Sequence, residues 1–211
     1  MTETSARPAS RRREHTRARL LDAAHDVFAE VGMDAASVEM ICERAGFTRG
    51  AFYSNFESKE ELFLALIIQL AEEKIEEVAG RVRELDRGDF ADPSELVRQV
   101  VGVSLGERME PQLVSEIRTQ AMRDTRLAAA YLAWQDAMRL RVEGIIVYVV
   151  DHVGLRLRLP VGETAQLLLD VSEDTCTRAT LEGRDEAEIT ELLNARLGRL
   201  VGALVESPDQ V

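Results

Sequence analysis

Residues 16–66 read TRARLLDAAHDVFAEVGMDAASVEMICERAGFTRGAFYSNFESKEELFLAL, and this segment contains the clearest structural pattern of the chain. Within it, the apolar residues of segment 20–31 recur at the three- and four-residue spacing of an amphipathic helix. Two shorter helices are predicted over residues 37–44 and 48–55, and each opens on a Ser or Thr that caps helices well. Gly46 lies between them, where a tight turn requires a left-handed backbone. A longer helix followed by two short helices and a glycine turn predicts a helix-turn-helix unit.

The second short helix has two chemically different faces. Phe52 and Phe56 are four residues apart and therefore share one face, which is expected to point into the core. The opposite face is polar and contains Thr48, Arg49, Tyr53 and Asn55. A rigid helix with an exposed polar edge of this kind is suited to reading DNA.

Residues 16–66 resemble the DNA-binding domain of the tetracycline-repressor (TetR) family, in the order LLDAA, F-AE-G, S-V--I---AG and RGAFYSNF-SKEEL. The resemblance covers about a quarter of the chain, and its ordered joint pattern is more specific than a bare helix-turn-helix. It implies a recognition helix over residues 48–55 that enters the major groove of operator DNA. The DNA contacts that it implies are Ser37, Val38, Thr48, Arg49, Gly50, Ala51, Tyr53, Asn55 and Lys59.

Three of these residues have distinct expected roles. Arg49 is expected to read a base, since its guanidinium fork matches guanine O6 and N7. Tyr53 and Lys59 match phosphate-contacting positions, and Lys59 begins a long helix whose N-terminus favours anions. The alternatives are a solvated or phosphate-bound Arg49, a Tyr53 that packs on the helices, and a Lys59 that belongs to a charged surface.

The remaining sequence predicts helices throughout, so the expected fold class is all-α, with about nine helices. The predicted organisation is a flexible basic tail (1–12), a three-helix helix-turn-helix domain (13–60) and a larger ligand-sensing and dimerisation domain (61–211). Helix starts are indicated by caps or prolines at Ser58, Asp92, Pro111, Asp124 and Asp185.

The resemblance implies that the protein is a homodimer, paired through its last two long helices. The candidate interface residues are Leu168, Leu169, Ser172, Cys176, Ala179, Leu193, Leu197, Leu200 and Leu204. A pocket for an unknown small-molecule effector is expected among the middle helices. Its candidate residues, each of which is otherwise ordinary core or surface, are Met109, Glu116, Met122, Tyr131, Trp134, Met138, Tyr148 and Asp174.

The charge distribution is compatible with DNA binding despite a formal net charge of −12. Residues 1–59 contain equal numbers of basic and acidic side chains, so the acidic excess belongs entirely to the rest of the chain. Screening limits the influence of distant charge to roughly 10 Å at physiological salt. The expected partners are an operator in double-stranded DNA, a second copy of the chain and the effector.

Several other classes of protein are disfavoured. The longest apolar run is too short for a membrane span, and no secretory signal is evident, so a cytoplasmic protein without a membrane partner is expected. No nucleophile or phosphate-binding motif indicates an enzyme, and no cysteine or histidine spacing indicates a metal or another cofactor. The alternative function is a redox-responsive regulator that acts through Cys42 or Cys176, although both lie on apolar helix faces.

Overall fold

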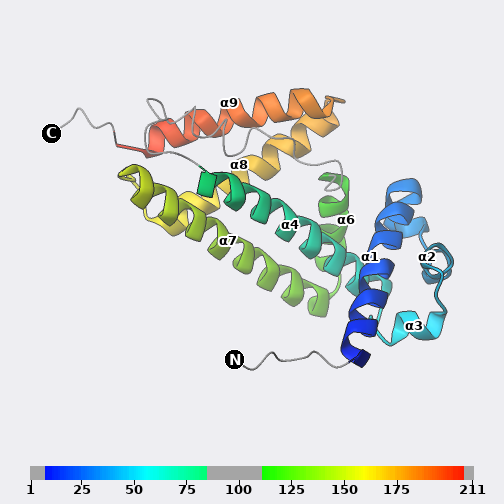
Figure 1. Cartoon of the computed structure of the whole chain (residues 1–211). Helices are drawn as coiled ribbons and strands as arrows, with labels where there is room; N and C mark the ends of the chain where they lie inside the picture. The colour runs from blue at the N-terminus through cyan, green and yellow to red at the C-terminus, as the bar shows by residue number, and fades with distance from the viewer. Residues whose placement is uncertain (1–7, 85–110, 207–211) are drawn as a thin grey trace, which may run out of the picture. The chain divides into compact units, whose positions relative to one another are not determined.

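The computed structural model describes residues 8–84 and 111–206, and over these residues the fold is all-α, as predicted. The described helices, labelled in Figure 1, are α1 (Pro8–Ala35), α2 (Val38–Ala45), α3 (Arg49–Tyr53), α4 (Lys59–Glu84), α6 (Pro111–Ala121), α7 (Thr125–Val153), α8 (Val161–Leu181) and α9 (Glu186–Leu204). The predicted helix start at Asp92 and the candidate pocket residue Met109 lie outside the described residues.

The chain divides into two compact units. The described part of the first unit is residues 8–69 and 113–131, which include α1, α2, α3, the first turns of α4 and most of α6. The second unit contains the rest of α4, most of α7 and all of α8 and α9. The division therefore falls within α4 and α7, and the first unit extends beyond residue 60, where the sequence placed the boundary.

The core of the first unit explains this longer boundary. Phe28 on α1 and Phe63 on α4 are almost fully buried, and their ring centroids lie 4.7 Å apart in an edge-to-face arrangement. Leu62, Leu66 and Ile67 are also buried, each with 1% or less of its surface exposed. Burying each of these side chains stabilises the fold by about 2 kcal/mol, so the first turns of α4 belong to the first unit.

The first helix differs from its prediction at both ends. It begins at Pro8, so residues 8–12, which were expected in a flexible tail, lie in its first turns. Proline is favoured at the first position of a helix because its fixed φ suits the helix and its missing N–H is not needed there. At Gly32 the backbone leaves the helical conformation, with φ 74° and ψ 166°, and one further helical turn follows to Ala35.

The predicted caps are present at the other helix starts. Ser37, Thr48 and Ser58 each accept a hydrogen bond from the backbone N–H three residues later. Asp124 accepts hydrogen bonds from the backbone of Arg126 and Leu127 at the start of α7. Because each cap satisfies a backbone donor that the helix leaves unpaired, these short polar residues determine where the helices begin.

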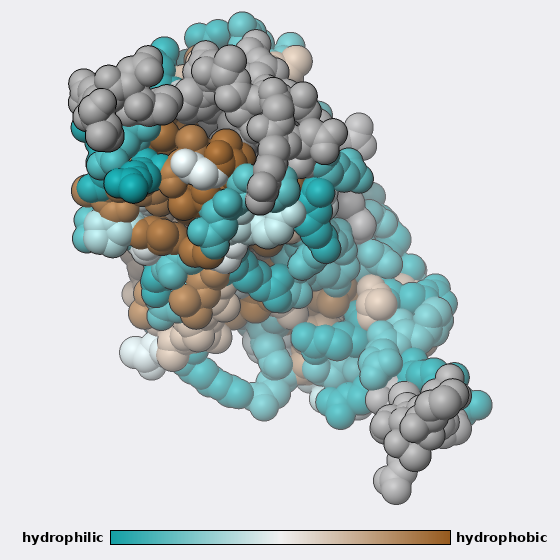
Figure 2. Space-filling model, turned by 60° about the vertical axis from the view of Figure 1, so that its left-hand side comes forward, coloured by the Kyte–Doolittle hydropathy of each residue, from teal (hydrophilic) through white to brown (hydrophobic). Residues whose placement is uncertain are grey.

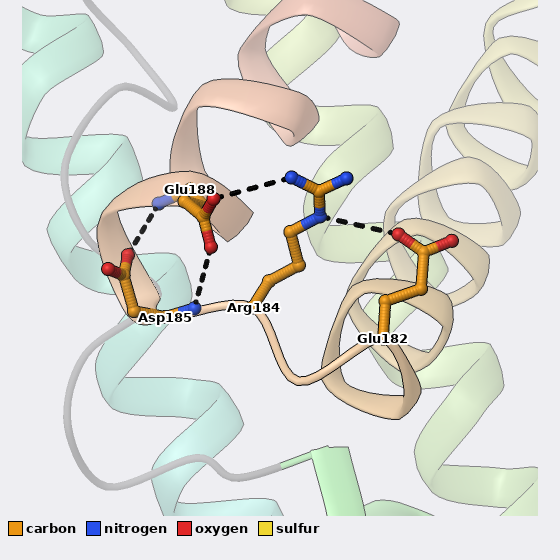
Figure 3. A network of polar contacts seen from close by, with 4 residues as sticks. All are labelled: Glu182, Arg184, Asp185 and Glu188. Atoms are coloured by element: carbon orange, nitrogen blue, oxygen red, sulfur yellow. Dashed lines mark hydrogen bonds and ion pairs between the residues drawn. The ribbon is translucent and has the colours of Figure 1, made fainter.

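In the second unit, α8 and α9 form a hairpin with a shared apolar cluster. Cys176 of α8 packs with Leu193 and Leu197 of α9. Figure 3 shows the polar network at the turn, where Asp185 and Glu188 form a reciprocal capping box and Arg184 pairs with Glu182 and Glu188. The capping box fixes the start of α9, which sets its register against α8.

Leu157, which precedes α8, forms an isolated antiparallel β-bridge with Val205, which follows α9. None of the helices in the described ranges combines the length and apolar character that crossing a bilayer would require.

Candidate nucleic-acid interface

The geometry of α3 is set by a glycine turn and two buried aromatic rings. Gly46 has φ 72° and ψ 33°, and its N–H donates to the end of α2, which closes that helix. Phe52 and Phe56 are 0% and 1% exposed, with ring centroids 5.9 Å apart. A left-handed residue with a side chain would cost about 1–2 kcal/mol at Gly46, so glycine suits this turn. The two rings then determine which edge of α3 faces solvent.

The exposed edge of α3 contains most of the residues that the resemblance implicates in DNA contact. Thr48, Arg49 and Gly50 are exposed, and Ala51 is half-buried. The side chain of Arg49 is 61% exposed, and Tyr53 is 50% exposed. The small residues between the two long polar side chains leave room for a close approach of another molecule.

Arg49 has two neighbours within the first unit. Its Nη1 lies 2.5 Å from Oε1 of Glu39 on α2, and its guanidinium carbon lies 5.9 Å from the ring centroid of Tyr53. The hydrogen bond with Tyr53 and the negative charge of Glu39 raise the pKa of Arg49, so it stays cationic. Glu39 was not among the candidate residues. An acidic side chain in the first turn of a helix is usually attributed to the helix dipole. The sequence alone therefore gives no reason to expect that Glu39 contacts Arg49.

The start of α2 lies next to this edge in the chain. Ser37 is half-buried and caps α2, and Val38 is also half-buried. Their side chains are therefore partly used by the fold, and their predicted DNA contacts stay predictions.

Asn55 and Lys59 make contacts inside the first unit. The Asn55 side-chain amide donates to the backbone oxygen of Ala51 at 2.8 Å, so it closes the end of α3. The Lys59 ammonium donates to the backbone oxygens of Met33 at 2.6 Å and Ala36 at 2.8 Å. This cation therefore binds the end of α1, where unpaired carbonyls carry partial negative charge. The phosphate contact that the sequence predicts for Lys59 stays a prediction.

The candidate pocket residues fall into two groups. In the first unit, Tyr131 is buried, Met122 is 75% exposed, and the Glu116 carboxylate accepts a hydrogen bond from the backbone N–H of Met33 at 3.0 Å. In the second unit, Trp134 and Met138 are half-buried and lie one turn apart on α7. Tyr148 is exposed and stacks on His152, while Asp174 is exposed and pairs with Arg196 at 2.8 Å. Only part of the predicted set therefore lies in the interior.

The candidate interface residues also have different environments. Several are buried within the single chain: Cys176, Ala179, Leu193, Leu197 and Leu204. Of these, Cys176, Leu193 and Leu197 pack together between α8 and α9. The others, Leu168, Leu169, Ser172 and Leu200, are partly buried. The sequence pattern does not separate residues that bind α8 to α9 from residues that are available to a second chain.

Both cysteines are buried, and desolvation raises their pKa values. For Cys176 the pKa reaches about 11. A thiol with a raised pKa forms little of the reactive thiolate at neutral pH, so neither environment favours the redox-responsive alternative. In residues 8–84 and 111–206, no group of three His, Cys, Asp or Glu side chains is arranged to hold a metal ion.

Comparison with known proteins agrees with the geometry of the first unit. Residues 20–66 match the family model for bacterial regulatory proteins of the tetR family. The chain is 28% identical to the HTH-type transcriptional regulator UidR of Escherichia coli K12 over 203 residues, which cover 89% of this chain and 94% of UidR.

Solved structures share the fold over nearly the whole chain. A TetR transcription regulator from Haloarcula marismortui superimposes with a TM-score of 0.69 at 15% identity, covering 92% of this chain and 100% of that one. Salmonella enterica GusR superimposes with a TM-score of 0.61 at 23% identity, covering 94% and 99%. Taken with the exposed polar edge of α3, the family match shows that residues 20–66 form a DNA-binding domain of the tetR family, while the rest of the chain is similar to a transcriptional regulator and shares the fold of TetR regulators.

Proposed function

We propose that this protein is a homodimeric repressor that binds an inverted-repeat operator and is released from it by a small-molecule effector. The observation that supports operator binding best is the exposed edge of α3. There Arg49 and Tyr53 face solvent while Phe52 and Phe56 anchor the helix from the other side. A short helix held rigidly with donors on its outer edge fits the major groove and can pair with guanine.

Binding as a dimer is supported by the chemistry of recognition and by the surface of the second unit. One small domain contacts few base pairs, whereas two related by a twofold axis read two half-sites. Large hydrophobic side chains are exposed on α7 and α8, namely Leu132, Leu140, Val147, Tyr148, Leu167 and Leu181. Figure 2 shows hydrophobic residues gathered on one part of the face that it draws. Exposed apolar surface of this kind is typical of a protein that binds a partner.

Release by an effector requires the ligand to bind one conformation better than another. The helices α4 and α7 each contribute residues to both units, so a change in one unit can be transmitted along a continuous helix. Glu116 and Gln120 of α6 also hydrogen-bond with Met33 and Asp34 at the end of α1. These contacts support a link between the middle helices and the helix-turn-helix.

The experiment is selection of bound sequences from a random duplex pool, combined with sedimentation of the protein–DNA complex. We expect an inverted repeat with half-site centres about 34–36 Å apart and two chains bound to each duplex. Arg49→Ala provides the control, because it should fold normally yet relax the base preference at one position in each half-site. A single asymmetric site bound by one chain would refute the dimeric proposal, and retention of all sequences alike would refute specific binding.

The effector proposal has a thermodynamic test of its own. Small molecules that stabilise the protein against heat are added to the operator complex, and both binding constants are measured. An effector should lower operator affinity by a certain factor, and operator DNA should lower effector affinity by the same factor. A stabilising ligand that leaves operator affinity unchanged would not be the effector of this mechanism.

A further inference from the structure

The ion pair between Glu39 and Arg49 lies on the surface proposed to read DNA. It joins the first turn of α2 to the first residue of α3, with 2.5 Å between the Glu39 Oε1 and Arg49 Nη1 atoms. The two side chains are 56% and 61% exposed. An ion pair this exposed contributes little to folding, because water screens both charges. The fold therefore does not need the carboxylate at this position.

A carboxylate on a DNA-binding edge also has a physical cost. Phosphates along both strands repel it, so Glu39 weakens binding to any DNA that offers only its backbone. The guanidinium of Arg49 can donate hydrogen bonds both to Glu39 and to an acceptor on the DNA. A phosphate that takes Arg49 leaves Glu39 facing negative charge without a donor.

The base edges in the major groove present hydrogen-bond donors as well as acceptors, whereas phosphate oxygens only accept. Guanine O6 and N7 accept from an arginine fork, and the cytosine N4 amino group donates to a carboxylate. An arginine and a glutamate held next to each other present donors and an acceptor together. This combination matches G·C pairs, where both kinds of group occur side by side.

We propose that Glu39 is a specificity-determining residue, which orients Arg49 for guanine, accepts from a cytosine amino group and disfavours contact with phosphates alone. The inference rests on the proposed operator binding, because it requires this edge to enter the major groove.

The test compares Glu39→Gln with wild type on two duplexes of equal length, the selected operator and a random sequence. Binding is followed by fluorescence anisotropy at several salt concentrations. We expect Glu39→Gln to bind the random duplex more tightly and to lower the operator-to-random affinity ratio by about tenfold, the effect of losing one good base contact. Repeating the selection with this variant should weaken the preference for G·C at one position in each half-site.

The matched control is Glu30→Gln. Glu30 pairs with Arg44 at 2.7 Å, the two side chains are 57% and 40% exposed, and this pair joins α1 to α2 in the same unit. The control removes the same charge from another exposed ion pair of the first unit, in which Arg44 donates to both carboxylate oxygens of Glu30. Because Glu30 is not on the edge of α3, the affinity ratio of this variant should stay within twofold of wild type. Thermal melting of both variants checks folding, which exposed positions should not disturb.

Two results would overturn the proposal, and they have different meanings. If Glu39→Gln keeps the wild-type affinity ratio and selects the same sequence, Glu39 has no role in specificity while operator binding stands. If the wild-type chain itself prefers no sequence, the proposed operator binding fails and the role of Glu39 fails with it.

Discussion

Replacing Lys59 by Met tests whether this lysine contacts DNA or stabilises the fold of the first unit. The family resemblance implies that it contacts a DNA phosphate, whereas its ammonium donates to the backbone oxygens of Met33 and Ala36 at 2.6 and 2.8 Å. Methionine keeps much of the apolar stem and removes the charge. If the structural contacts are the main role, Lys59→Met should destabilise the first unit rather than selectively weaken DNA binding.

The expected magnitude follows from the two hydrogen bonds. A hydrogen bond to a charged group contributes about 1.5–3 kcal/mol when it is buried. Lys59 is half-buried, so water replaces part of what each carbonyl loses. We therefore expect a loss of about 2 kcal/mol in the free energy of unfolding, which for a chain of this length corresponds to roughly 4–8 °C in melting temperature.

Hydrogen exchange measures this loss where it occurs. The backbone amides of the α1–α2 connection should exchange about thirtyfold faster in Lys59→Met, the equivalent of about 2 kcal/mol. The control is Lys74→Met, at the other lysine of the chain, which lies on the same helix and pairs with Glu77 three residues away. Lys74 belongs to the second unit, so Lys74→Met should leave the exchange rates of the α1–α2 connection at their wild-type values.

Salt dependence distinguishes the two roles on DNA. A lysine that neutralises a phosphate lowers the slope of log affinity against log salt by about 1 when it is removed. We expect Lys59→Met to leave this slope unchanged. A variant with wild-type exchange rates and a slope reduced by one unit would refute the structural assignment and support the phosphate contact.

Three further perturbations follow from other sites. Arg49→Ala should weaken operator binding by about 1–3 kcal/mol and relax the preference at one base position, as measured by anisotropy on single-base operator variants; an unchanged preference would mean that Arg49 reads no base. Gly46→Ala places a side chain where φ is 72°. It should lower the free energy of unfolding in urea by about 1–2 kcal/mol, whereas no loss would show that the turn relaxes at little cost. The thiol of Cys176, whose pKa is raised to about 11, stays protonated until pH rises towards that value. Its alkylation at pH 8 should therefore be about a hundredfold slower than that of an ordinary cysteine and should accelerate with increasing pH, and fast alkylation at pH 7 would reopen the redox-responsive alternative.

Local sequence rules account for much of the first unit. The caps at Ser37 and Thr48, the turn at Gly46 and the inward pair Phe52 and Phe56 were all predicted, and the structure has each of them. These features depend on residues within about one helical turn of each other, where backbone hydrogen bonding and helical period determine the outcome. The helix-turn-helix and the polar edge of α3 could therefore be predicted from the residues of this segment alone.

The contacts of the charged side chains, in contrast, depend on how the helices pack and could not be predicted from the sequence. Lys59 donates a hydrogen bond to the backbone oxygen of Met33, 26 residues away in the sequence. Glu116 accepts one from the backbone N–H of Met33, 83 residues away. Glu39 and Arg49 are adjacent only because the Gly46 turn brings the starts of α2 and α3 together. The partner of a long charged side chain lies at no fixed spacing from it in the sequence. It is an unpaired group that the packing of the helices brings within reach. Such partners therefore depend on how the helices pack rather than on the pattern of residues along the chain.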